Sequence, residues 1–226
     1  MAAPLAIFGA GGFAREVLQI VLDINDQLPA PVWEPVGFVV DPAYAGERVV
    51  HGLPVWLGAD ALTQAFAEVS WVVAVGNSAA RRQIVMRLNA AQERRFVSLV
   101  HPRAWVGRQV DLGAGSVVCA GCQITTDVRV GQHVHINIAC TVGHDAVLED
   151  FVTLNPAVNV SGNVALGQGV EVGTNSVLIP HANVGAWSIV GAGSVVTRPL
   201  AGNVTAVGAP ARVIKSRSAG WHATAA

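Results

Sequence analysis

The chain has 226 residues and a mass of 23.4 kDa, which allows one large domain or two small ones. Hydrophobic residues make up 52% and charged residues 13%, and the formal net charge of −1 argues against a protein that binds nucleic acid by neutralising phosphates. No apolar run is long enough to span a bilayer as a helix, and the N-terminus lacks the form of a secretory signal. Three cysteines cannot pair completely, so we expect a reduced, cytoplasmic setting.

Strands and helices alternate over the first hundred residues. Apolar strands are expected at 5–8, 36–40, 71–75 and 96–99, and helices at 16–28, 59–67 and 79–91, with a turn-rich segment around 52–55. Ser78 is placed to cap the last of these helices. This alternation predicts a small parallel α/β sheet, which amounts to half of a Rossmann-like domain.

A glycine-rich loop follows the first strand. Its spacing, Gly9-x-Gly11-x-x-Ala14, fits the alanine form of the dinucleotide fingerprint, in which the backbone approaches a phosphate at a helix N-terminus. A hundred residues are too few for a complete NAD enzyme, so a nucleotide attached to a sugar fits better. A tight turn needed only for packing is the alternative. The expected substrate-binding residues lie in this loop and at the ends of later strands: Gly9, Gly11, Gly12, Phe13, Asp41, Gly76 and Asn77.

From Val100 to Val196, every sixth residue is Ile, Leu or Val, and the residue four positions after each is small or aliphatic. A period of six fits neither an amphipathic helix nor an alternating strand. It is typical of short parallel strands stacked in coils, where equivalent side chains lie above one another. We expect the bulky column to fill the corners of a prism and the smaller column to face inward.

This repeat resembles the hexapeptide-repeat acyltransferases, whose left-handed parallel β-helix has three hexapeptides in each triangular coil. The segment Val207–Arg212, with the sequence VGAPAR, is similar to the one that closes these helices. Combined with the glycine loop, the pattern resembles the sugar O-acyltransferases related to sialic acid O-acetyltransferase, over residues 5–214. The family includes N-acetyltransferases of nucleotide-linked amino sugars. The resemblance implies a sugar-nucleotide-binding α/β domain at 1–98, a β-helix acyltransferase domain at 99–214 and a tail at 215–226.

The resemblance further implies an enzyme that transfers an acetyl group from acetyl-CoA to the amine of a nucleotide-linked sugar. It also implies a homotrimer with active sites between subunits and a role in glycan synthesis. No metal is expected. O-acetylation of a sugar such as sialic acid is the alternative among enzymes, and a non-catalytic scaffold that binds sugar nucleotides is the alternative of another class.

The segment from Val142 to Phe151 carries the histidine and acid that the family uses. The resemblance makes His144 the general base and gives Asp145 the task of orienting its ring. Neighbouring side chains on a strand point to opposite faces, so this pair requires a turn. Direct attack needs no protein nucleophile, and a backbone N–H would stabilise the oxyanion. Further implied contacts are Asn137 with the neighbouring subunit's substrate, and four residues with the coenzyme: Thr153, Gly162, Thr174 and Ala192.

Several other residues are open to two interpretations. A metal site from His133, His135 and His144 is conceivable, whereas Cys122 and Cys140 belong to the inward column and act as apolar fillers. We expect His101 to be structural. Arg81 and Arg82 either face solvent on a helix or contact a phosphate, and the sequence leaves open whether Trp187 and Trp221 flank a coenzyme or a subunit contact.

Overall fold

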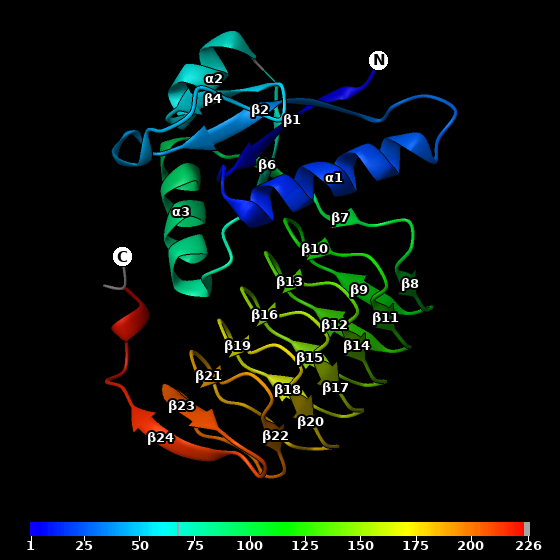
Figure 1. The fold of residues 1–226 in the computed structure, drawn as a ribbon, viewed down its shortest axis with the longest axis vertical. Coiled ribbons are helices and arrows are strands. Elements are labelled where there is room, and N and C mark those ends of the chain that lie inside the picture. The colour runs from blue at the N-terminus through cyan, green and yellow to red at the C-terminus, as the bar shows by residue number, and fades with distance from the viewer. Residues whose placement is uncertain (67, 224–226) are drawn as a thin grey trace.

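The computed structural model describes residues 1–66 and 68–223. An α/β unit at the N-terminus leads into a column of stacked coils, and the C-terminal tail runs back towards the N-terminal unit (Figure 1). The elements of the first unit are β1 (Ala3–Phe8), α1 (Gly12–Asp26), β2 (Trp33–Val40), the short helix η1 (Pro42–Tyr44), β3 (Val49–Val50), β4 (Leu53–Leu57), α2 (Ala59–Ala65), β5 (Ser70–Val73), α3 (Ser78–Ala91) and β6 (Arg95–Phe96).

The N-terminal strands form one sheet in the order β3-β4-β2-β1-β5-β6, and all neighbours are parallel except β3 and β4. Alternate residues of β1 face opposite sides, as a pleated strand requires. Leu5 and Ile7 pack with α1, whereas Ala6 and Phe8 pack with α2 and α3. The sheet is therefore covered by helices on both faces, as expected for an α/β unit with a mostly parallel sheet.

Four local predictions need correction. The segment around 52–55 contains β4, a strand of the sheet rather than a turn alone, and α1 begins at Gly12 instead of residue 16. The helix predicted at 59–67 ends at Ala65, and residue 67 lies outside the described residues. Asn77, not Ser78, caps α3, because its side-chain oxygen accepts from the Ala80 backbone N–H.

The coils contribute short parallel strands to three sheets. The eight-stranded sheet holds β7 (Leu99–Val100), β10 (Val117–Val118), β13 (His135–Ile136), β16 (Thr153–Leu154), β19 (Glu171–Val172), β21 (Ile189–Val190), β23 (Val204–Val207) and β24 (Arg212–Ser216). The six-stranded sheet holds β8 (Trp105–Val106), β11 (Gln123–Ile124), β14 (Thr141–Val142), β17 (Asn159–Val160), β20 (Val177–Leu178) and β22 (Val195–Val196). The four-stranded sheet holds β9 (Val110–Leu112), β12 (Val128–Val130), β15 (Val147–Leu148) and β18 (Ala165–Leu166).

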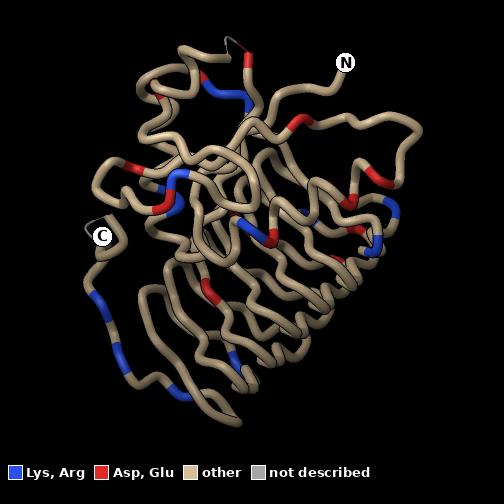
Figure 2. Tube along the Cα trace, turned by 45° about the horizontal axis from the view of Figure 1, so that its top comes forward, with Lys and Arg blue, Asp and Glu red and all other residues tan. Residues whose placement is uncertain are grey.

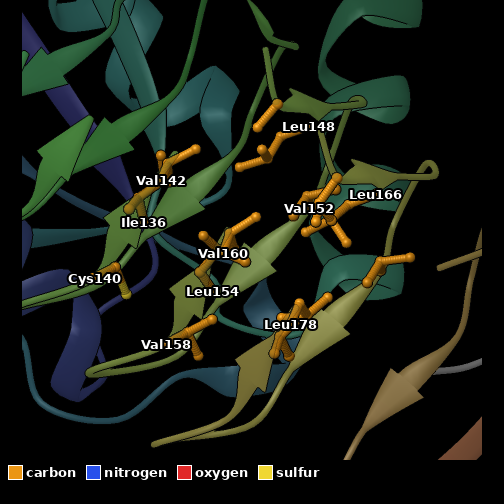
Figure 3. Packing of buried hydrophobic residues seen from close by; sticks show 14 of the residues in the cluster. Ile136, Cys140, Val142, Leu148, Val152, Leu154, Val158, Val160, Leu166 and Leu178 are labelled. Carbon is orange, nitrogen blue, oxygen red and sulfur yellow. The ribbon is translucent and has the colours of Figure 1, made fainter. Parts of the chain in front are cut away.

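Each coil takes eighteen residues, since Val117 pairs with His135 and His135 with Thr153. The aliphatic column and the smaller inward column meet in one buried core, where Val142, Val160 and Leu178 stack above one another (Figure 3). Burying one such side chain stabilises the fold by roughly 1.5–3 kcal/mol, which is why the repeat is strict. Segment 207–212 forms the turn between the antiparallel strands β23 and β24 at the end of the coils.

The two parts of the molecule pack against each other through apolar side chains. Leu99, Val117 and Cys119 from the first coils pack with α1, and Phe151 packs with the opposite face of the N-terminal sheet. The eight-stranded sheet is therefore the one on which the N-terminal unit docks. Among the described residues, no helix is both long and apolar enough to cross a membrane.

Candidate active site

His144 lies at the corner where the six-stranded sheet turns into the four-stranded sheet, between β14 and β15. Its neighbour Asp145 has a φ of +59°, and this left-handed conformation brings the two adjacent side chains together. The His144 Nδ1 atom lies 2.7 Å from Asp145 Oδ2, and the side chains are 60% and 56% exposed. The turn that the sequence-based pairing requires is therefore present.

The hydrogen bond to Asp145 determines which ring nitrogen is free. A carboxylate only accepts, so the neutral imidazole of His144 carries its proton on Nδ1 and leaves the Nε2 lone pair available. No described residue forms a hydrogen bond with Nε2. An exposed imidazole in this tautomer is suited to accept a proton from an approaching nucleophile.

Gly162 lies one coil beyond His144 and directly against its ring. A Cβ atom on Gly162 would stand 2.7 Å from both Nε2 and Cε1 of His144, so only glycine lets the imidazole occupy this position. The Gly162 N–H has no acceptor among the described residues. A free backbone donor beside the free ring nitrogen provides two of the groups that acyl transfer needs, a base and an oxyanion donor.

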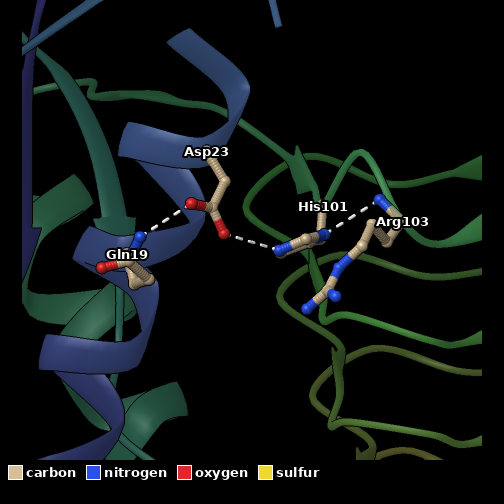
Figure 4. A network of polar contacts seen from close by, with 4 residues as sticks. All are labelled: Gln19, Asp23, His101 and Arg103. Carbon is tan, nitrogen blue, oxygen red and sulfur yellow. Dashed lines mark hydrogen bonds and ion pairs between the residues drawn. The ribbon is translucent and has the colours of Figure 1, made fainter. Parts of the chain in front are cut away.

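A second His–Asp pair, between the first coil and α1, has a different arrangement (Figure 4). His101 Nε2 lies 2.7 Å from Asp23 Oδ2, and His101 Nδ1 accepts from the Arg103 backbone N–H. The hydrogen bonds with Gln19 and with His101 lower the pKa of Asp23, against the effect of burial. Both ring nitrogens of His101 are occupied and its side chain is 6% exposed, so the expectation that this residue is structural agrees with its position.

The glycine loop opens on a cleft of about 1010 Å³ between β1, the end of β2 and α3. Three of the predicted substrate-binding residues line it, namely Gly9, Gly11 and Asp41. Arg15 and Arg87 line the cleft as well, although neither was predicted from the sequence as a substrate-binding residue. The available signal for Arg87 was helical spacing, because Ala80, Ile84 and Arg87 share one face of α3.

The two glycines of the fingerprint have separate roles. Gly9 has a φ of +111°, and a Cβ there would stand 2.9 Å from the Ala74 carbonyl oxygen, so packing alone requires this glycine. Gly11 has a φ of −78°, and no heavy atom lies within 4 Å of the position of its missing Cβ. Gly11 is the N-cap of α1, where glycine is among the preferred residues, and the open space at its Cα leaves room for a ligand to approach the backbone.

The remaining predicted substrate residues lie outside the lining of this cleft. Gly12 follows the loop at the start of α1, and Phe13 packs its ring 4.8 Å from that of His135. The Gly76 carbonyl accepts from Arg81 at 3.0 Å. Asn77 caps α3 and donates its amide to Glu171, 3.2 Å away on β19. Phe13, Gly76 and Asn77 therefore contact the coils, through His135, Thr153 and Glu171 respectively.

Arg81 is the centre of that junction and is fully buried, which contradicts the prediction of a solvated helix face. Its guanidinium donates to the backbone oxygens of Val75, Gly76, His133 and Phe151. Burial lowers the pKa of Arg81 to about 9, and the charge of Glu171 opposes this shift. Its donors are used within the protein, so the alternative of a phosphate contact does not fit either. Arg82 instead lies 5.9 Å from the centre of the Trp187 ring.

Thr153 is also part of the junction, although it was predicted to contact a coenzyme. It is 3% exposed, and its hydroxyl is 3.0 Å from that of Ser78 and 2.8 Å from Arg81 Nη2. This leaves the Thr153 side chain no free surface for a coenzyme. No local sequence pattern indicated this burial, because the partners Ser78 and Arg81 come from α3, more than seventy residues earlier in the chain.

Asn137, Thr174 and Ala192 lie at another corner of the prism, where the eight-stranded sheet turns into the six-stranded one. Thr174 and Ala192 are exposed, and Asn137 is half-buried with its amide donating to the Leu154 carbonyl at 2.7 Å. Within one chain these residues and His144 stand at opposite ends of the six-stranded sheet. The structure brings Gly162 to His144 and places the other three predicted contacts apart from it.

The residues considered for metals and aromatic contacts have structural partners. The His133 ring stacks on Phe151 at 5.3 Å, and burial, followed by the charge of Arg81, lowers the pKa of His133 to about 4. The part of the chain that the structure describes holds no group of three His, Cys, Asp or Glu residues arranged for a metal. Trp187 stacks on His222 of the tail at 3.7 Å, and Arg217 lies over Trp221. Cys122 and Cys140 are buried in the core, as expected for apolar fillers.

A coil of hexapeptide repeats with an exposed histidine at a corner, joined to a glycine-loop α/β unit, defines a hexapeptide-repeat acyltransferase. Comparison with known proteins agrees. Residues 4–88 match the PglD N-terminal domain. GDP-perosamine N-acetyltransferase of Escherichia coli O157:H7 is 28% identical over 221 residues, covering 92% of this chain and 95% of the relative.

Several solved structures match over nearly the full length, and two of them carry the comparison. A mutant of perosamine N-acetyltransferase from Caulobacter crescentus, in complex with CoA and GDP-perosamine, is 30% identical with a TM-score of 0.85, covering 95% of this chain and 98% of that one. The acetyltransferase domain of PglB from Neisseria gonorrhoeae, in complex with acetyl coenzyme A, is 29% identical with a TM-score of 0.83, covering 95% and 100%.

The chain therefore belongs to the family of sugar acetyltransferases that includes the perosamine N-acetyltransferases. Membership confirms the predicted fold, an α/β half-domain followed by a left-handed parallel β-helix, and the predicted enzyme class, an acetyltransferase. The acetyl-CoA in the gonococcal structure agrees with the predicted co-substrate.

Proposed function

We propose that this protein transfers the acetyl group of acetyl-CoA to the amine of a nucleotide-linked amino sugar. The observation that carries the proposal is the exposed His144, with Nδ1 fixed by Asp145 and Nε2 free beside the N–H of Gly162. The relatives that match over the full length include enzymes of GDP-perosamine, whose acceptor is an amine, and this favours N-acetylation over O-acetylation.

The chemistry is direct attack within a ternary complex. The sugar amine attacks the carbonyl carbon of the thioester while His144 Nε2 takes up its proton, and the N–H of Gly162 donates to the developing oxyanion. Collapse of the tetrahedral intermediate breaks the C–S bond, and the proton on His144 passes to the departing thiolate. Asp145 stabilises the imidazolium during these steps. Amide and free coenzyme A are the products, and no covalent enzyme intermediate forms.

The cleft of the N-terminal unit is the proposed site of the nucleotide. The loop at Gly11 lets the phosphates approach the N-terminus of α1, where the helix dipole favours negative charge. In this assignment residues 1–98 bind the sugar nucleotide, residues 99–214 carry out acyl transfer and residues 215–226 form the tail, the last three of which lie outside the described residues.

A homotrimer with shared active sites fits the distribution of the predicted contacts. His144 and Gly162 occupy one corner of the prism, whereas the predicted coenzyme contacts Thr174 and Ala192 and the predicted substrate contact Asn137 occupy another. An active site that uses both sets therefore requires two copies of the chain. Charged residues are sparse along the coils (Figure 2). From Phe151 to Thr197 the only Asp, Glu, Lys or Arg in the sequence is Glu171, whose carboxylate accepts from the Ser78 backbone N–H at the start of α3. An uncharged flank of this kind is suited to burial between subunits.

The test measures release of the coenzyme A thiol from acetyl-CoA with a panel of amino-sugar nucleotides. We expect turnover with at least one of them. We also expect Gly11→Val to weaken binding of the sugar nucleotide while leaving coenzyme A binding unchanged. The new side chain enters the open cleft without strain, since the φ of Gly11 suits any residue. Turnover only with sugars that carry a hydroxyl in place of the amine would favour the O-acetyltransferase alternative. Binding of sugar nucleotides without any turnover would favour the scaffold.

A further inference from the structure

Residues 217–223 leave the coils after β24 and run back to α3 (Figure 1). We call this segment the strap. It begins where the Arg217 backbone N–H donates to the carbonyl of Asn203, directly before β23, at 2.8 Å. It continues through the exposed residues 218–220 and ends in the short helix η2 (Trp221–Ala223). The strap therefore connects the last coils with the N-terminal unit.

Two stacked rings hold the strap on the coils. The imidazole of His222 lies nearly parallel to the indole of Trp187, with 3.7 Å between the ring centroids and 8° between the planes. Trp187 is 6% exposed, and a Cβ atom on Gly169, one coil earlier, would overlap its ring. The corresponding positions of earlier coils carry the larger side chains of His133 and Phe151. Glycine at position 169 therefore makes the space in which this indole packs against His222.

The strap also contacts the wall of the cleft, through α3. Gln83 lines the cleft, and its Nε2 donates to the carbonyl oxygens of His222 and Ala223, at 3.2 and 3.3 Å. The preceding residue, Arg82, lies 5.9 Å from the centre of the Trp187 ring. A carbonyl oxygen only accepts, so the docked strap requires the Gln83 amide to turn its nitrogen towards it. The orientation of a side chain in the cleft wall thus depends on a contact made outside the cleft.

The surroundings of the strap allow it to open locally. Residues 218–220 are exposed, and Gly220 has a φ of +82°, which glycine adopts without strain. The start of α3 is held independently of the strap, because Asn77 and Arg81 bond to the coils. Segments with exposed backbone and few buried contacts open at low cost in free energy. Opening of the strap therefore releases Gln83 without moving the helix that carries it.

We propose that Trp187 and His222 are positioning residues for the nucleotide, because by latching the strap they fix Gln83 in the orientation that the occupied cleft requires. The inference rests on the proposed function of the cleft and adds a coupling between the cleft and the last coils. When the strap is open, Gln83 rotates freely, and a ligand that contacts it must also order it, which weakens binding. Coupling free energies are reciprocal, so a nucleotide in the cleft favours the closed strap by the same factor.

The experiment measures by calorimetry the affinity of the full-length protein for GDP, UDP and dTDP, and separately for coenzyme A. His222→Ala removes the ring that stacks on Trp187, and we expect it to weaken binding of each nucleoside diphosphate that binds by about three- to tenfold. His222→Phe keeps a ring for the stack and should restore the affinity to within about twofold of that of the unsubstituted protein. The affinity for coenzyme A should be the same in all of these proteins.

Ser218→Ala is the matched control, because it changes an exposed residue of the same strap and removes no ring. Its nucleotide affinity should equal that of the unsubstituted protein. A second measurement needs no substitution: amide hydrogen exchange in residues 217–223 should slow several-fold when the nucleotide is bound.

Equal nucleotide affinity of His222→Ala and the unsubstituted protein overturns this inference alone, and so does exchange that the nucleotide leaves unchanged. A loss of affinity that His222→Phe does not restore, or one that extends to coenzyme A, overturns it as well. If none of the three nucleoside diphosphates binds the unsubstituted protein, both the inference and the proposed role of the cleft are overturned.

Discussion

Two His–Asp pairs with the same 2.7 Å separation occupy this chain, and their surroundings give them opposite properties. His101 is enclosed between the first coil and α1, and both of its nitrogens have partners. His144 is exposed at a corner and uses only Nδ1. The comparison shows that a His–Asp contact does not by itself indicate catalysis. A histidine can act as a base only if one ring nitrogen has no hydrogen-bond partner in the protein and is accessible to a substrate.

The largest effect should come from His144→Ala. Removing the proposed general base should lower turnover at least ~100-fold, whereas the melting temperature should hardly change, because the side chain is exposed. Release of coenzyme A thiol measures the first quantity and differential scanning calorimetry the second. Turnover close to that of the unsubstituted enzyme would remove His144 from the mechanism.

His101→Ala should show the reverse behaviour. It leaves the Arg103 N–H and a carboxylate oxygen of Asp23 without their partner, so we expect a loss of about 1–3 kcal/mol in the free energy of unfolding. Urea denaturation measures this, and turnover per folded molecule should stay within about twofold. A catalytic loss as large as that of His144→Ala would abolish the distinction between the two pairs.

Asp145→Asn should have an intermediate effect on turnover, about tenfold, because the amide still bonds the ring but no longer stabilises the imidazolium. Asp23→Asn is its control in the other pair and should leave turnover unchanged. If Asp145→Asn lowered turnover as much as His144→Ala, the carboxylate would contribute more to catalysis than orienting the ring and stabilising the imidazolium.

The smallest effect concerns His133, a histidine without an acidic partner. Its pKa is lowered to about 4 from 6.5, first by burial and then by Arg81, so the unfolded chain binds more protons between these two values. Stability is therefore fully present well above pH 6.5, begins to fall as the pH approaches 6.5 and continues to fall towards pH 4. Between pH 7 and pH 6 the expected loss is on the order of 0.5 kcal/mol. In His133→Phe the dependence of the melting temperature on pH should be weaker in this range, and an unchanged slope would contradict the assignment.

Much of the site is local in sequence and was predictable for that reason. His144 and Asp145 are adjacent, and Gly162 follows one coil later. Gly9 and Gly11 belong to one loop. Motif and spacing alone were therefore enough to predict that these residues lie close together. Arg81 and Thr153 were misjudged, since the contact between their side chains joins positions 72 residues apart. Arg87 was missed for the same reason, because its partner Asp41 is 46 residues away.

The sequence by itself determined the β-helix, because a strict six-residue period can satisfy its backbone and bury its aliphatic columns in only a few ways. It also determined that a glycine loop stands between a strand and a helix. Only the tertiary structure decided which histidine is open, which arginine is buried and which corner each contact occupies. Those properties depend on how the N-terminal unit sits on the eight-stranded sheet, and such long-range packing leaves no periodic signal along the chain.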